Sequence, residues 1–126
     1  MGNSLKNEFA AYEHALAVKE LGFNWKCFGF YDSPTLQLMH CINSEPWMGN
    51  AVVAAPLKSQ LFRFFREKYN QNSFIELVYQ DGIKYDYVLY ADKDEEVCGN
   101  FGDGPFNTYE EAENACINKL IEIAKQ

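Results

Sequence analysis

The sequence has no excess of basic residues: 11 Lys and Arg stand against 18 Asp and Glu, which gives a formal net charge of −7. A protein that grips duplex nucleic acid through its backbone normally carries a basic excess, because phosphate neutralisation supplies most of that affinity. The same charge argument disfavours an acidic membrane surface. We therefore expect neither duplex nucleic acid nor a membrane as the partner of this protein.

The sequence also lacks long hydrophobic runs. No apolar stretch approaches the roughly 20 residues that span a bilayer, and residues 1–9 are polar and lack the apolar core of a signal peptide. These features predict a cytoplasmic protein. The four cysteines occur singly: Cys27, Cys41, Cys98 and Cys116. An even number could form two disulfides in a secreted chain, but a reducing cytoplasm favours four free thiols.

Close-spaced metal ligands are missing too. The sequence contains neither C-x-x-C nor H-x-x-x-H, the ligand pairs typical of zinc sites. The acidic stretch 92–96 lacks the glycine that a calcium loop needs at its sixth position, where Val97 stands. The glycine-rich stretch 99–104 matches neither common phosphate-loop pattern. We therefore expect no metal and no cofactor.

Catalytic motifs are equally scarce, and only two histidines are present. The enzymatic hypothesis that remains is a cysteine nucleophile, Cys41 or Cys27, activated by His14 or His40. His40 and Cys41 cannot pair with each other on a strand, because adjacent side chains point to opposite faces. An enzyme is therefore the less favoured class, and we assign no catalytic residue.

The composition that is present suits a folded domain. Hydrophobic residues make up 48% and aromatic residues 16% of the chain, so a core of ordinary density is within reach. A chain of 126 residues is short for two independently stable cores. We therefore predict a single domain over residues 1–126.

Three segments have the 3.6-residue apolar period of amphipathic helices. They are 7–21, 56–69 and the segment that begins at Thr108. Gly22 is placed to end the first helix, Pro56 suits the first position of the second, and Asn70 is placed to cap its end. Thr108 and Glu111 have the spacing of a capping box.

Between these helices the sequence predicts strands, most of them rich in aromatic or β-branched residues. They are 26–31, 36–42, a short strand at 51–54, 73–79 and 83–91. The fold class is therefore α+β: an antiparallel sheet of four to five strands with three helices, in the order α-β-β-(β)-α-β-β-α.

The strongest turn signal is Asp81-Gly82, which predicts a two-residue type I′ hairpin with positive φ at both positions. That register places Val78 opposite Tyr85. It also places Phe74 opposite Leu89.

Several stretches resemble small proteins of gut Bacteroides phages and prophages. The matching residues are Tyr12–Phe23, Cys27–Tyr31, Ala55–Tyr69 and Tyr109–Cys116 running into Lys119–Ile123. They span all three predicted helices and the first strand. The resemblance implies phage origin and expression inside an infected cell, and it supplies no catalytic residue.

The second predicted helix is the basic exception. Residues 56–70 hold four basic side chains against one acidic, a local charge of +3. A spacing of 4, 3 and 4 places four polar residues on one stripe: Ser59, Arg63, Arg66 and Asn70. Two guanidinium groups one turn apart can hold a phosphate or carboxylate, and nearby aromatic rings can stack a base. The alternative is an ordinary helix surface whose arginines pair with acidic neighbours.

The segment 92–113 is strongly acidic, with eight carboxylates and one lysine. Such a run is usually a solvated face, but it could also mimic a nucleic acid and occupy a basic site on a partner. The candidate partner-binding residues in it are Asp92, Asp94, Glu95, Glu96 and Asp103.

We therefore expect a phage-encoded, non-enzymatic binding protein that acts in the host cytoplasm and inhibits a host defence protein by direct contact. The alternative is sequestration of a small anionic nucleotide through the basic stripe. A small cysteine-dependent enzyme is the second alternative. The sequence does not decide the oligomeric state.

Overall fold

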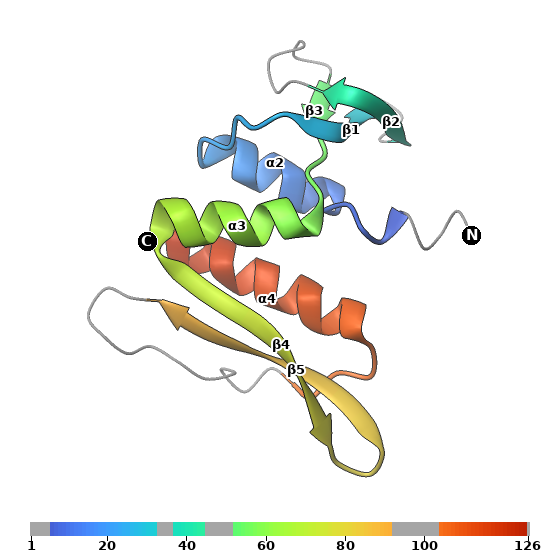
Figure 1. Ribbon diagram of the computed structural model, residues 1–126, viewed down its shortest axis with the longest axis vertical. Coiled ribbons are helices and arrows are strands. Elements are labelled where there is room, and N and C mark those ends of the chain that lie inside the picture. The colour runs from blue at the N-terminus through green and yellow to red at the C-terminus, as the bar shows by residue number, and fades with distance from the viewer. Residues whose placement is uncertain (1–5, 33–36, 45–51, 92–103, 126) are drawn as a thin grey trace. The chain divides into compact units, whose positions relative to one another are not determined.

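The computed structural model describes residues 6–32, 37–44, 52–91 and 104–125 (Figure 1). Its elements in chain order are α2 (Tyr12–Glu20), β1 (Cys27–Asp32), β2 (Gln37–Ser44), β3 (Val52–Ala54), α3 (Lys58–Tyr69), β4 (Gln71–Tyr79), β5 (Ile83–Ala91) and α4 (Tyr109–Ala124). Helices and antiparallel strands are both present, so the predicted α+β class is confirmed.

Within the described residues the strands form two sheets, not the one sheet that the sequence predicted. One has the order β2-β1-β3 and the other is the hairpin β4-β5. In each pairing, either both strands come before α3 in the chain, as in β1 with β2 and β3, or both come after it, as in β4 with β5. Local alternation shows where strands lie but not which strand edges meet, so the number of sheets could not be read from it.

The chain divides into two compact units, Met1–Leu61 and Phe62–Gln126, with the boundary inside α3. The single domain expected from the length stays a prediction.

In the first unit the helix α2 begins later than predicted. Phe9 forms an antiparallel bridge with Leu57, and the N–H of Ala10 donates to the carbonyl of Pro56 over 2.8 Å. An extended backbone that bonds to a distant segment cannot also make helical i→i−4 bonds. The predicted start at residue 7 was therefore wrong, because a tertiary pairing overrides the apolar period.

The same pairing shortens α3. Pro56 was predicted as the first helical residue, but Pro56 and Leu57 belong to the extended pairing and the helix starts at Lys58. The predicted ends are confirmed: Gly22 has φ 99° after α2, and Asn70 has φ 55° after α3. Both are the left-handed conformations that commonly stop a helix.

Tyr31 of β1 stabilises the core of this unit. Its hydroxyl donates to the carbonyl of Ala10 over 2.6 Å, and its ring meets Tyr12 edge-on at 5.5 Å. Burial raises the pKa of Tyr31 above its ordinary value, and the nearby carboxylate of Glu13 adds to the effect. Tyr31 belongs to a cluster of buried residues whose other members are Phe9, Ala15, Val53 and Ala55.

In the second unit the hairpin turn has the predicted conformation but not the predicted register. Asp81 has φ 59° and Gly82 has φ 113°, so positive φ at both residues is confirmed. However, Tyr79 pairs with Ile83, so the loop contains three residues and includes Gln80.

The predicted pairs were therefore wrong by one residue: Val78 pairs with Lys84, and Phe74 pairs with Val88. The strands pair without interruption from Gln71↔Ala91 to Tyr79↔Ile83. A shift of one residue moves every side chain of one strand to the other face relative to its partner. As a result, the odd-numbered residues of both strands share one face of the hairpin.

Helix α4 packs against this odd-numbered face (Figure 1). Ser73 of β4 forms a side-chain hydrogen bond with Cys116 of α4, and the ring of Tyr85 meets that of Tyr109 edge-on at 5.8 Å. Tyr87 and Leu89 are fully buried. The buried residues of α4 are Ala112, Cys116, Ile117, Leu120 and Ile121. They follow the predicted apolar period, but Tyr109, predicted on the same stripe, is 45% exposed.

The outer edge of β5 is bonded to the segment that precedes α4. Tyr85 and Phe106 exchange two backbone hydrogen bonds, with N···O distances of 2.9 and 2.6 Å. Lys84 Nζ donates to Asn107 Oδ1 over 2.6 Å. The segment 104–107 therefore covers this edge where it passes Tyr85.

Candidate functional site

The basic stripe predicted on the second helix lies on α3 and just beyond its end. Ser59, Arg63 and Arg66 are exposed, and Asn70 follows the last helical residue. Arg63 Nε donates to Glu67 Oε2 over 2.8 Å, and this bond and the carboxylate charge raise the pKa of Arg63 above its ordinary value. If the stripe is an ordinary helix surface, its arginines should pair with acidic neighbours, and Arg63 does so with Glu67. The anion site on this stripe stays a prediction.

The acidic candidates cannot be placed in the same way. Asp92, Asp94, Glu95, Glu96 and Asp103 all lie outside the described residues. Their proposed role in partner binding stays a prediction.

The two cysteines whose side chains are described are buried free thiols. Cys27 donates from Sγ to the carbonyl of Trp25 over 3.4 Å. Burial raises the pKa of Cys116 to about 11, against a smaller lowering by its hydrogen bond with Ser73. The thiolate is the nucleophilic form, so burial and a raised pKa make Cys116 a poor nucleophile. The side chains of His40 and Cys41 lie outside the described part of the chain.

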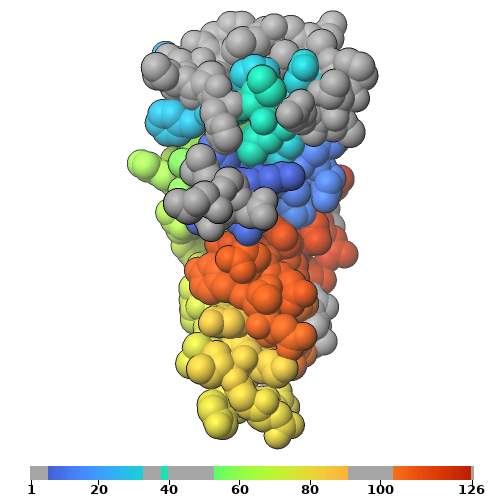
Figure 2. Space-filling view, turned by 90° about the vertical axis from the view of Figure 1, so that its right-hand side faces the viewer, coloured from blue at the N-terminus to red at the C-terminus, as the bar shows by residue number. Residues whose placement is uncertain are grey.

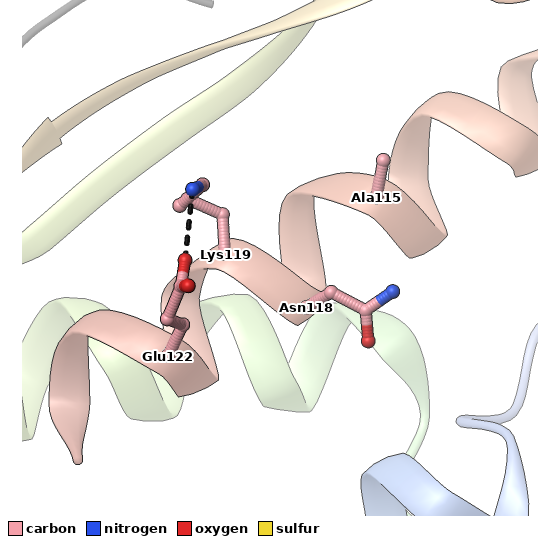
Figure 3. A pocket seen from close by; sticks show the side chains of 4 residues that line it. All are labelled: Ala115, Asn118, Lys119 and Glu122. Carbon is pink, nitrogen blue, oxygen red and sulfur yellow. Dashed lines mark ion pairs between the residues drawn. The ribbon is translucent and has the colours of Figure 1, made fainter. Parts of the chain in front are cut away.

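The exposed face of α4 carries two adjoining shallow depressions. The smaller has a volume of about 290 Å³ and is lined by Ala115, Asn118, Lys119 and Glu122 (Figure 3). Lys119 Nζ and Glu122 Oε1 form an ion pair at 2.8 Å across it. Because the one cation in its lining is already paired, this depression offers little to an anionic ligand.

The larger depression, of about 460 Å³, is lined by Pro105, Phe106, Asn107, Glu111, Asn114, Ala115 and Asn118. Its one unusual group is Asn114 Oδ1, which is buried and accepts no hydrogen bond from any described residue. A single acceptor in an open depression does not define a ligand. Among the residues that the structure describes, no three His, Cys, Asp or Glu side chains lie together as metal ligands.

The most distinctive surface is the end of the β4–β5 hairpin. Leu77, Tyr79 and Ile83 lie on its odd-numbered face with exposed fractions of 63%, 81% and 58%. Tyr109 packs against Tyr85, the residue opposite Leu77 in the register, and is 45% exposed. We call Leu77, Tyr79, Ile83 and Tyr109 the hairpin-end patch.

The start of α4 explains why this patch is exposed. Thr108 accepts a hydrogen bond from the N–H of Glu111, and the Glu111 carboxylate accepts one from the N–H of Thr108, so the predicted capping box is confirmed. The helix therefore begins at Tyr109, beside Tyr85. The hairpin continues towards its turn beyond that point, and Figure 2 shows its end (yellow) extending past α4 (orange).

Sequence reasoning missed the hairpin-end patch. The predicted register, with Val78 opposite Tyr85, places Ile83 on the face of the even-numbered residues of β4. It would put Leu77 and Tyr79 on the other face, so no continuous patch was predicted. A signal was nevertheless present, because Leu77, Tyr79 and Ile83 are large apolar residues around a turn where exposed polar residues are usual.

No protein-family model matches this chain, and the searches of curated proteins and of solved structures found no match. None of the described helices combines the length and the apolar character needed to cross a bilayer.

Proposed function

We propose that this chain is a phage-encoded, non-catalytic binding protein that inhibits a host protein inside the infected cell by contacting it through the hairpin-end patch. The observation that carries this proposal is the exposure of Leu77, Tyr79 and Ile83 on one face of the hairpin. Phage origin and host location rest on the sequence resemblance.

The energetics favour a protein partner for this surface. Burying an aliphatic or aromatic side chain of this size in an interface stabilises a complex by about 1.5–3 kcal/mol. The side chains at the hairpin end stay exposed in the fold, so this free energy is still available for binding a partner. Tyrosine is enriched where protein interfaces are strongest, because it combines a large apolar ring with a polar tip. The patch has charged neighbours in the exposed Asp81 and Glu110, an arrangement typical of an apolar contact with a polar rim.

The proposal can be tested by site-specific photocrosslinking in infected cells. A benzophenone amino acid placed at Tyr79 should crosslink one host protein when the phage protein is produced during infection. The matched control carries the same group at Phe28, an exposed aromatic residue of the first unit with an exposed fraction of 53%. Mass spectrometry identifies the captured chain in each case.

A host protein captured from Tyr79 and not from Phe28 supports the proposal. No capture from Tyr79, or the same proteins from both positions, rejects the hairpin end as the contact. The variant Leu77→Asp, with the benzophenone group kept at position 79, should lose the captured protein while its melting temperature stays close to that of the parent protein, because a leucine with an exposed fraction of 63% contributes little to the fold.

A further inference from the structure

The backbone of β5 has a defined orientation at Tyr85. Both its N–H and its C=O are bonded to Phe106, on the side away from β4. In an antiparallel pair the N–H and C=O of one residue point to the same side, and this side alternates from each residue to the next. Tyr85 therefore belongs to a pair that makes no ladder hydrogen bond with β4.

This orientation also determines which groups of β4 point outwards. Leu77 lies opposite Tyr85 in the register, so its N–H and C=O point away from β5. Alternation gives the same outward direction to Ile75 and Tyr79. The bond from the N–H of Gln80 to the carbonyl of Gly82, at 2.8 Å, agrees with this alternation, since it places Gln80 among the residues that face β5.

No described residue satisfies these outward groups. The backbone N–H and C=O of Ile75, Leu77 and Tyr79 make no hydrogen bond within the part of the chain that the structure describes. On the other side of the hairpin, Phe106 covers β5 at Tyr85. Among the described residues, this small sheet is therefore covered on the β5 side at Tyr85, and no described segment pairs with the β4 side, which we call the open edge.

The open edge also lacks the features that normally prevent pairing with another chain. Natural edge strands are protected by lysine, proline, a bulge or a very short length. β4 has nine residues and contains no Lys, Arg, Pro or Gly, and its register with β5 is continuous. Its only charged residue is Glu76. Such an edge is a ready template for an added strand.

We infer that an extended segment of the partner protein adds to β4 as a third strand of this sheet and bonds to the backbone of Ile75, Leu77 and Tyr79. This inference rests on the proposed function and describes how the partner binds. The added strand would lie beside Leu77 and Tyr79 on the odd-numbered face of the hairpin. On the even-numbered face it would lie beside Glu76 and Phe74, which is 52% exposed.

Charge determines what kind of segment fits. An apolar residue suits the positions beside Leu77 and Tyr79, and a lysine or arginine suits the position beside Glu76, since opposite charges on neighbouring strands attract. A second copy of this chain fits less well. Antiparallel pairing of two β4 edges centred on Ile75 or Leu77 would make the two Glu76 carboxylates diagonal neighbours, and each copy carries a net charge of −7. The occupant is therefore a segment in which apolar and basic residues alternate.

Residue-resolved amide hydrogen exchange of the full-length protein tests this arrangement directly. In the free protein the amides of Ile75, Leu77 and Tyr79 should exchange about 100-fold faster than those of Phe74, Glu76 and Val78, because only the second set bonds to β5. The probe is the synthetic peptide acetyl-(Lys-Val)₃-amide, and its control is acetyl-(Glu-Val)₃-amide. The lysine peptide should slow the first set by about tenfold and leave the second unchanged, whereas the glutamate peptide should do neither.

The variant Glu76→Lys provides the charge test. Its melting curve establishes that it is folded, and it should reverse the preference, so that the glutamate peptide gives the stronger protection. An unchanged preference rejects the charge argument for the occupant. Slow exchange at Ile75, Leu77 and Tyr79 in the free protein shows that the edge is already covered, and protection that rises with protein concentration identifies a second copy; both results overturn the inference.

The failure of this inference and that of the proposed function are distinguishable. A host protein crosslinked from Tyr79, without protection of the outward amides by the lysine peptide, rejects strand addition and leaves the proposed function standing. Protection of those amides without a crosslink from Tyr79 rejects the proposed function and supports the open edge as a strand-binding site.

Discussion

Gly104 lies directly against the carboxylate of Asp86: a Cβ atom at position 104 would be 2.5 Å from Asp86 Cγ. Asp86 is a buried residue of β5, 3% exposed, and its Oδ1 accepts the N–H of Tyr87 over 2.8 Å. Glycine at 104 therefore allows the segment before α4 to approach β5 closely. The same segment places Phe106 against Tyr85.

Gly104→Ala should lower the free energy of unfolding by about 1–3 kcal/mol, because an overpacked contact with a buried side chain displaces backbone or side chain. Urea unfolding measures the change. In the double variant with Asp86→Ala the added methyl group has room, so the combined loss should be smaller than the sum of the two single losses. Strictly additive losses would show that the contact with Asp86 is not the cause.

Gly82→Val should destabilise the hairpin by about 1–3 kcal/mol, because a β-branched residue resists a backbone with positive φ. Gly82 has φ 113°, and nothing lies within 4 Å of the position of an added Cβ, so the loss reflects backbone conformation alone. Gly82→Asn is the matched control, since asparagine tolerates positive φ better than valine. Equal melting temperatures for the two variants would contradict this explanation.

Glu111→Ala should cost about 0.5–2 kcal/mol, because the capping box loses one of its two reciprocal hydrogen bonds. The Glu111 carboxylate accepts from the backbone N–H groups of Asn107 and Thr108, over 3.1 and 3.2 Å. Glu110→Ala removes a carboxylate from the same first turn and leaves the capping box intact. In thermal unfolding, Glu110→Ala should therefore have a higher melting temperature than Glu111→Ala. The reverse order would show that the capping box does not stabilise the start of α4.

The folded protein should lose stability at alkaline pH through Cys116. Burial raises the pKa of this thiol to about 11, whereas the pKa of a thiol in an unfolded chain is about 8.5. Above that pH the unfolded chain releases a proton that the folded chain retains, so the free energy of unfolding falls as the pH rises towards 11.

The contribution should reach roughly 1–2 kcal/mol by pH 10. Burial also raises the pKa of Tyr31, which contributes a loss of stability of the same sign at alkaline pH. The measured quantity is therefore the difference in slope between wild type and Cys116→Ala in urea unfolding from pH 7.5 to 10. The wild type should have the steeper decline. Parallel curves would show that Cys116 ionises equally in both states.

Glu67→Gln should strengthen any binding of phosphate-bearing ligands to the basic stripe, because it removes the carboxylate that holds Arg63. The Arg63–Glu67 pair is exposed, with side-chain exposed fractions of 65% and 54%, so the fold should change little. Calorimetry with mono-, di- and cyclic nucleotides, with the double variant Arg63→Ala and Arg66→Ala as control, measures the effect. If Glu67→Gln binds none of them, the stripe is an ordinary helix surface.

Local patterns in the sequence predicted much of this structure. The capping box at Thr108, the left-handed residues Gly22 and Asn70 and the buried stripe of α4 all follow from interactions between residues close in the chain. Helix caps and apolar periods are set within one or two turns, so they can be recognised without knowledge of the rest of the molecule.

Long-range contacts decided the remainder. Residues 7–11 have an apolar period compatible with a helix, yet Phe9 pairs with Leu57 because an extended backbone there gains hydrogen bonds with a distant segment. The hairpin register differs by one residue from the predicted one, and whether Leu77, Tyr79 and Ile83 share a face depends on that residue alone. Their exposure depends in turn on where α4 begins beside β5. The sequence by itself thus determined which segments form helices and strands, where α2 and α3 end and how α4 is capped. The tertiary structure decided where α2 and α3 begin, the open edge and the hairpin-end patch, because these arise from contacts between segments that no local pattern encodes.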